Sequence, residues 1–106
     1  MALFEVGPLP GDPLTAAAYF HAEVLTKIPD TPPLTLVFPP ADHTHSAWRL
    51  AVVQSLGRAW APDRINGVVS DDPGAIAAAD RFLDGAEGVT GQLLALDGKS
   101  AGDMLS

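Results

Sequence analysis

The hydrophobic positions of this chain change their spacing several times from one end to the other. Short, mainly apolar runs, which are typical of strands in a sheet, occupy residues 2–6, 34–38, 64–69 and 92–98. Between them, apolar residues recur at steps of three and four, which predicts helices over residues 13–28, 46–61 and 73–84. Strands joined by helices lie parallel, because a helical crossover returns the chain to the same end of the sheet. We therefore predict an α/β fold with four parallel strands in sequential order and three helices, in one domain spanning residues 1–106.

Short polar motifs mark where the predicted helices begin. Asp12-Pro13 and Asp72-Pro73 each place a capping carboxylate before a proline, whose missing N–H costs nothing at the first helical position. For the second helix we expect Thr44 or Ser46 to provide the cap. His21 lies on the apolar stripe of the first helix, where we expect a hydrogen-bonded core residue. That stripe is expected to face the sheet and consists of Leu14, Ala17, Ala18, His21, Val24, Leu25 and Ile28.

Composition and charge exclude several classes of function. The formal net charge is −7, with 13 acidic and six basic residues, and the basic residues form no cluster. Nucleic acid and anionic membrane surfaces are therefore not expected partners. No window of 18 uncharged apolar residues exists, and the start "MALFEV" has no basic region, so neither a membrane span nor a secretory signal is expected. The absence of cysteine excludes thiol chemistry and fits a cytoplasmic protein.

Three motifs between residues 45 and 98 occur in a specific order. They are "HSAWR" at residues 45–49, "APDRINGVV" at residues 61–69 and "GVTGQLLALDG" at residues 88–98. In this order and spacing, the chain from Leu34 to Gly98 resembles the C-terminal half of the short-chain dehydrogenase/reductase family. The resemblance implies a Rossmann-like fold. By extension, residues 2–28 would correspond to the preceding strand and helix of that family.

The resemblance also implies where an active site would lie, and the chain departs from the family there. The positions of the family's catalytic tyrosine and lysine hold His45 and Arg49, and the position of its serine falls in the buried run 34–38. No glycine-rich G-x-G-x-x-G turn occurs in these 106 residues, and the turn at residues 7–11 contains two prolines that donate no N–H to a phosphate. We therefore expect His45 and Arg49 to be vestigial, with no bound cofactor and no catalysis. An alternative stays open: a residual oxidoreductase, or a small-ligand or nucleotide-binding protein, that uses the His45 and Arg49 region.

Other candidate chemistry has a structural explanation that we favour. His43 and His45 beside Asp42 are too few to complete a zinc site, so no metal is expected. Ser46 has no nucleophile-elbow motif around it. Asp71 and Asp72 suit the start of a helix better than an acid pair in catalysis.

The helix at residues 46–61 carries two apolar stripes, whereas a helix on the surface of a monomer needs only one. The first stripe, expected to pack on the sheet, consists of Leu50, Val53, Gly57 and Trp60. The second is expected to form an interface and consists of Trp48, Ala51, Val52, Ser55 and Ala59. Members of the family associate through the equivalent helix, and three helices leave part of a four-stranded sheet bare. We therefore expect a homodimer or higher homo-oligomer, or packing on a full-length short-chain dehydrogenase homologue.

Overall fold

A four-stranded parallel sheet forms the centre of the molecule in a computed structural model that describes residues 2–96. The strands are β1 (Ala2–Glu5), β2 (Leu34–Phe38), β3 (Ile65–Val69) and β4 (Leu93–Ala95), in the order β1-β2-β3-β4. The predicted sequential parallel sheet is thus confirmed. Residues 97 and 98 of the predicted last strand lie outside the described residues.

The helical segments follow the predicted order. The first consists of α1 (Pro13–Tyr19), a π-helical turn η1 (Phe20–Val24) and a 3-10 turn η2 (Leu25–Lys27). A 3-10 turn η3 (His43–His45) leads into α2 (Ser46–Ala59), and α3 (Pro73–Gly85) lies between β3 and β4. Asp72 caps α3 as predicted, because its carboxylate accepts from the N–H groups of Gly74 and Ala75.

Asp12 caps α1 in the predicted way. Its carboxylate accepts from the backbone N–H of Thr15 at 3.0 Å and from the Thr15 hydroxyl at 2.9 Å. These two hydrogen bonds, the backbone one first, lower the pKa of Asp12 below its ordinary value of 3.8, because they stabilise the ionised form. The ionised form of Asp12 is therefore the better cap for this helix.

The prediction of an apolar stripe on the first helix was wrong in part. Leu14 is 84% exposed, and Ala18 and His21 are also exposed. The buried positions are Ala16, Phe20 and Val24, at steps of four. In a straight α-helix such steps drift by about 40° each, and the wider π-helical turn that begins at Phe20 compensates for that drift.

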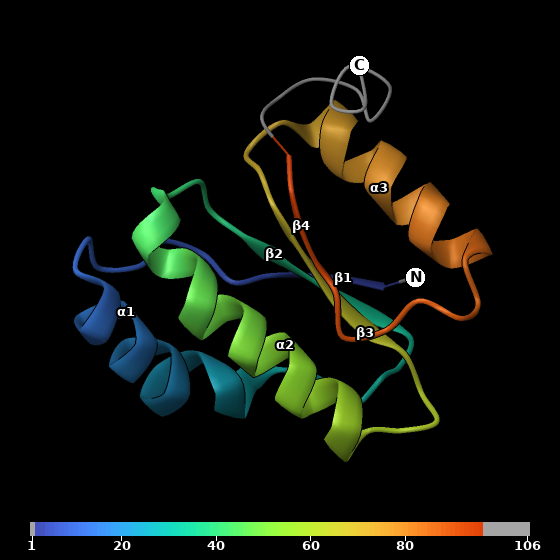
Figure 1. Cartoon of the computed structure of the whole chain (residues 1–106), viewed down its shortest axis with the longest axis horizontal. Helices are drawn as coiled ribbons and strands as arrows, with labels where there is room; N and C mark the ends of the chain where they lie inside the picture. The colour runs from blue at the N-terminus through green and yellow to red at the C-terminus, as the bar shows by residue number, and fades with distance from the viewer. Residues whose placement is uncertain (1, 97–106) are drawn as a thin grey trace.

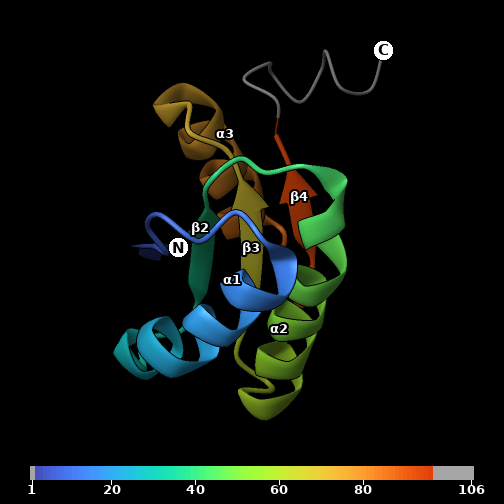
Figure 2. The same cartoon turned by 90° about the vertical axis from the view of Figure 1, so that its left-hand side faces the viewer.

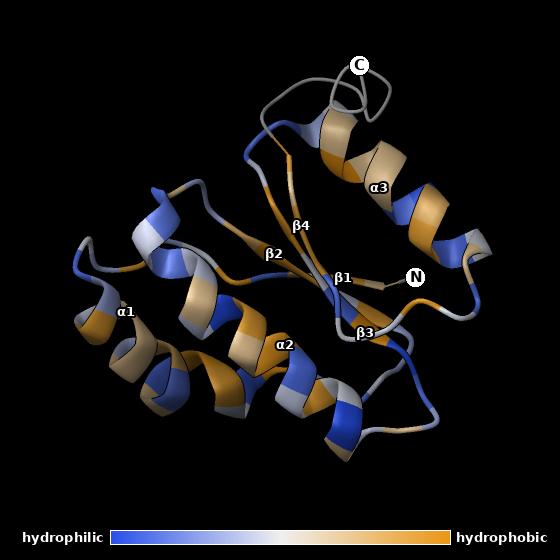
Figure 3. Cartoon of the chain, viewed as in Figure 1, coloured by the Kyte–Doolittle hydropathy of each residue, from blue (hydrophilic) through white to orange (hydrophobic). Residues whose placement is uncertain are grey.

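The helices cover the two faces of the sheet unequally (Figure 1). Leu34, Leu36 and Phe38 point to the core beneath η1 and α2, whereas Val37 belongs to the core beneath α3. β2 is therefore buried on both faces, which explains its continuous apolar sequence. Figure 2 shows α1 and α2 side by side on one face, and Figure 3 shows the apolar strands between the helical layers.

Because α3 lies on the face opposite α1 and α2, the β3–α3–β4 crossover has the opposite hand from the two crossovers before it. Crossovers between parallel strands nearly always share one hand, so this arrangement is unusual. It leaves β4 without a helix of its own on the α2 face. Leu93 and Ala95 instead line a hollow beside α2.

The motifs that resemble the dehydrogenase family hold β3 and β4 together. The Asn66 side chain donates to Val89 O and accepts from Gln92 N, both at 3.0 Å. The Thr90 hydroxyl accepts from Ile65 N at 3.1 Å. Asn66 is fully buried, and a buried polar side chain is stable only when it is bonded in this way, so Asn66 has a structural role here.

Candidate functional site

The loops after β1 and β2 meet at the carboxyl edge of the sheet, where ligands commonly bind in parallel α/β folds. They contain residues 7–11 and 39–42, and η3 and α2 follow the second loop. Asp42, rather than the predicted Thr44 or Ser46, caps this helical segment. Its carboxylate accepts from the hydroxyl and from the backbone N–H of Thr44, and these bonds lower the pKa of Asp42 below 3.8.

His45 lies 4% exposed between the two loops. The indole N–H of Trp48 donates to His45 Nδ1 at 3.2 Å, which assigns the ring proton to Nε2. His45 Nε2 then donates to the carbonyl of Gly11 at 3.0 Å. Both ring nitrogens are thus engaged within the chain, and the imidazole fastens the loop before α1 to the start of α2.

Arg49 lies one turn further along α2 and is only 2% exposed. Its Nη1 donates to the carbonyl of Pro39 at 2.8 Å. The guanidinium carbon lies 5.0 Å from the Phe38 ring centre and 5.6 Å from the Trp48 ring centre, within the range of cation–π attraction. Burial lowers the pKa of Arg49 from its usual value, and no carboxylate of residues 2–96 forms an ion pair with it. Among the described residues, the two aromatic rings and the Pro39 carbonyl compensate for the desolvation of this buried positive charge.

Phe20 completes this cluster and was missed by the sequence analysis. Its ring lies 5.9 Å from that of Phe38 and 5.6 Å from that of Trp48. The apolar stripe predicted through Leu14 and His21 places Phe20 on the wrong side of its helix. Residues at i and i+3 are neighbours on a helix, so the spacing of His45 and Trp48 was a local signal of the cluster. The sequence offers no comparable local signal for Phe20.

Two hollows adjoin Arg49 and share Ala41, Asp42, His45 and Arg49 in their walls. The first, of about 370 Å³, lies between the two proline-containing loops and is completed by Pro8, Leu9, Pro10, Gly11, Pro39 and Pro40. The second, of about 230 Å³, is completed by Ser46, Leu50, Val69, Leu93 and Ala95.

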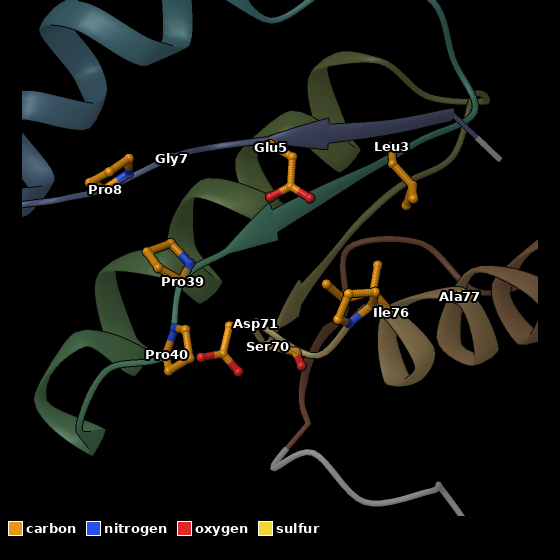
Figure 4. A pocket seen from close by; sticks show the side chains of 11 residues that line it. Leu3, Glu5, Gly7, Pro8, Pro39, Pro40, Ser70, Asp71, Ile76 and Ala77 are labelled. Atoms are coloured by element: carbon orange, nitrogen blue, oxygen red, sulfur yellow. The ribbon is translucent and has the colours of Figure 1, made fainter.

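A larger hollow of about 640 Å³ lies on the other face of the sheet, beside α3 (Figure 4). Glu5 from β1 and Asp71 from the loop after β3 extend into it. Leu3 and Ile76 supply apolar wall, and Leu3 is 45% exposed. This is the part of the α3 face that α3 does not cover. Neither Tyr nor Lys lines it, so it contains no counterpart of the family's catalytic pair.

The predicted interface stripe on α2 is divided by the structure. Ala51, Ser55 and Ala59 are exposed, whereas Val52 is 6% exposed and belongs to the core of its own chain. Trp48 is half-buried. On the other predicted stripe, Val53 and Gly57 are buried as expected, but Leu50 is 37% exposed because Arg49 occupies the inward position beside it.

A shallow groove of about 230 Å³ runs between η1 and α2. Its walls comprise His21, Leu25, Trp48, Ala51, Val52, Ser55 and Leu56. His21 is exposed, and its Nδ1 lies 2.7 Å from Ala17 O, so its assignment to the core was wrong. Part of the exposed α2 stripe thus forms the wall of a groove.

Neither a metal cluster nor a membrane-spanning helix is found among residues 2–96. Within residues 2–96, no three His, Cys, Asp or Glu side chains lie close enough together to hold a metal ion. None of the helices in that range is long and apolar enough to cross a bilayer.

Parallel strands, helices on both faces and loops gathered at the carboxyl edge define a Rossmann-like α/β protein. A family model described as short chain dehydrogenase-like protein matches residues 4–96, and the chain belongs to this family. No curated protein and no solved structure matches the chain.

The dehydrogenase family implies a nicotinamide dinucleotide, and the residues at the equivalent positions do not fit one. The Arg49 side chain is packed between aromatic rings, and both His45 ring nitrogens are bonded inside the chain. Pro8 and Pro10 remove two N–H donors from the facing loop. His45 and Arg49 are therefore not exposed proton donors, and the two prolines weaken the facing loop as an amide cradle for a pyrophosphate.

Proposed function

We propose that this chain is a non-catalytic member of the short-chain dehydrogenase-like family that self-associates, or packs on a full-length homologue, through the outer face of α2. One observation supports the non-catalytic part most strongly. His45, at the position of the family's tyrosine, has both ring nitrogens bonded to Gly11 O or Trp48, and Arg49, at the lysine position, donates Nη1 to Pro39 O. A general acid must reach the substrate within hydrogen-bond distance, and these groups are buried.

The exposed face of α2 supports the interface. Ala51, Ser55 and Ala59 present small side chains at steps of four, which allow a second helix to approach closely. The half-buried Trp48 and the groove beside it add apolar surface to this face. Self-association with two-fold symmetry is the commonest way to cover such a surface.

The oligomeric state tests this interface directly. We expect the wild type to elute as a dimer or larger assembly in size-exclusion chromatography with light scattering at micromolar concentration. Ala51→Arg should convert it to a monomer, because a charged side chain would enter the helix contact. Ala77→Arg, at an exposed position on α3, is the matched control and should leave the assembly intact. A wild type that is strictly monomeric, alone and when mixed with a full-length homologue, would refute the proposal.

The alternative, a residual oxidoreductase, makes a different prediction. A ligand that binds only the folded state raises its melting temperature. We expect neither NADH nor NADPH to raise the melting temperature of this chain, because the site does not fit a dinucleotide. A saturable rise would support the alternative instead. The lack of cysteine suits a reducing compartment, and we place the protein in the cytoplasm as part of the same proposal.

A further inference from the structure

The loops after β2 and β3 leave the carboxyl edge of the sheet in opposite directions. The loop after β2 leads to α2 on one face, and the loop after β3 leads to α3 on the other. Neighbouring loops that diverge in this way open a crevice at the carboxyl edge, which is where parallel α/β proteins commonly bind ligands. The hollow beside α3 reaches into this crevice, since Pro39 of the first loop and Asp71 of the second both line it (Figure 4).

This hollow has the size and the wall of a small-ligand site. Its volume of about 640 Å³ lies within the usual range for such sites, and most of the surface that lines it is apolar. Leu3 on β1, Ile76 on α3 and four prolines supply that apolar surface. Leu3 is 45% exposed, so part of the wall is left in contact with water. An organic ligand of moderate size would cover it.

The polar groups of the wall select the charge of the ligand. Glu5 and Asp71 are both exposed, so their carboxylates are within reach of a ligand that enters the hollow. Among the described residues, no Lys, Arg or His lines the hollow. Carboxylates beside an apolar wall attract a cation more strongly than they would in open water, because the effective dielectric constant is lower there. The wall therefore suits a cation.

The start of α3, at the edge of the hollow, offers little to an anion. Helix N-termini commonly bind anions through their free backbone N–H groups. Here the Asp72 carboxylate already accepts from the N–H groups of Gly74 and Ala75. Pro73 has no N–H, and neither do the other prolines of the wall. An anion such as a pyrophosphate would meet two carboxylates and few donors.

We propose that this hollow binds a small organic amine, with its ammonium group at Glu5 and Asp71 and its apolar body against Leu3 and Ile76. An ammonium group has three N–H donors, and ionised carboxylates only accept. The apolar wall supplies affinity by removing the body of the amine from water, and the carboxylates supply the selectivity for positive charge. This inference concerns the α3 face of the sheet and does not depend on the proposed self-association through α2.

The test is an NMR titration of the ¹⁵N-labelled chain, followed through the backbone amide signals of Leu3, Gly7, Asp71 and Ala77. Phenethylamine is the probe, phenethyl alcohol is its neutral control, and phenylacetate is the anionic control. We expect the amine to shift these signals saturably and to bind about fivefold more tightly than the alcohol, or better, with no saturable shift from phenylacetate. Equal binding of the amine and the alcohol would overturn the proposal. So would the lack of a saturable shift, which is the result expected if a second copy of the chain covered the hollow.

Two charge-removing variants test the place of the ammonium group. Glu5→Gln and Asp71→Asn keep the shape of each side chain at exposed positions, so both variants should fold. Each should lower the affinity for phenethylamine about twofold to fivefold and leave that for phenethyl alcohol unchanged. Glu87→Gln, exposed but outside the wall of the hollow, is the matched control for the loss of one negative charge and should bind the amine as the wild type does. An equal loss in Glu87→Gln, or no loss in the two hollow variants, would overturn the proposal.

Discussion

Gly67 in the middle of β3 offers the sharpest test of how α2 packs on the sheet. A Cβ added at this position would lie 2.9 Å from Val53 Cγ2, 3.0 Å from Leu93 Cδ1 and 3.2 Å from Phe38 Cε2. Val53 and Phe38 are fully buried, and the β-branched side chain of Val53 has little freedom to rotate. Leu93 is partly exposed at the last strand of the sheet and can move more easily. Gly67→Ala should therefore push α2 away from β3.

The expected loss is modest but measurable. Overpacking a tight core by a small group costs about 1–3 kcal/mol. Replacing glycine also restricts the unfolded chain, which stabilises the folded state by about 0.4–1 kcal/mol. The net destabilisation of Gly67→Ala should be about 1–2 kcal/mol. In a domain of this size, each kcal/mol corresponds to roughly 4–8 °C in melting temperature.

Urea denaturation followed by Trp fluorescence would measure this loss. Gly85→Ala is the matched control: an added Cβ there meets nothing within 4 Å, and Gly85 has no positive φ. This variant should be more stable than the wild type by about 0.4–1 kcal/mol. Val53→Ala removes the clashing methyl group, so Gly67→Ala should cost less in that background than in the wild type. If Gly67→Ala were as stable as Gly85→Ala, the packing described here would be refuted. The same would hold if the stability effects of Gly67→Ala and Val53→Ala were simply additive in the double variant.

Three further predictions concern the first helix and the His45 cluster. Phe20→Ala should cost about 3–5 kcal/mol because Phe20 is fully buried. Leu14→Ala, at an 84% exposed position, should change stability by less than about 0.5 kcal/mol. If urea titrations showed equal stability losses for Phe20→Ala and Leu14→Ala, Leu14 would face the sheet as the sequence predicted. Trp48→Phe removes the donor to His45 Nδ1 at a cost of about 1 kcal/mol for the hydrogen bond, and unchanged imidazole ¹⁵N shifts would argue against that bond. The folded-state pKa of Asp12 lies below 3.8, so its stabilisation is present above that pH and is lost as the pH falls through the folded value. Asp12→Asn should therefore flatten the acid side of the stability–pH curve, and an identical slope in both proteins would contradict the capping role.

Much of the fold could be predicted because its signals are local. The run "LTLVF" reads as a buried strand without any knowledge of its partners, and Asp-Pro pairs mark helix starts through the chemistry of two adjacent residues. The order of strands followed from the regular alternation with helices. The first helix was harder, because the π-helical turn at Phe20 changes which residues face the sheet, and no single-residue signal announces such a turn.

The sequence predicts where in the chain the candidate site lies, whereas the character of that site depends on distant contacts. The sequence places His45 and Arg49 one turn apart at the start of α2, and the family resemblance marks them as the positions of interest. It does not show that His45 reaches Gly11, 34 residues away, or that Arg49 lies between Phe38 and Trp48. Those contacts require the loop after β1 to lie beside the loop after β2.

The amino-acid sequence by itself therefore determined the elements, their order and the parallel sheet, since these follow from periodicity and capping within short windows. Only the tertiary structure decided on which face of the sheet each helix lies. That choice placed α3 opposite α1 and α2, left Leu3 and Leu93 partly uncovered, and enclosed the Arg49 guanidinium with an unpaired Nε. The physical reason is that a helix with an apolar face can pack on either side of a sheet, and only the summed contacts of the whole chain select one side.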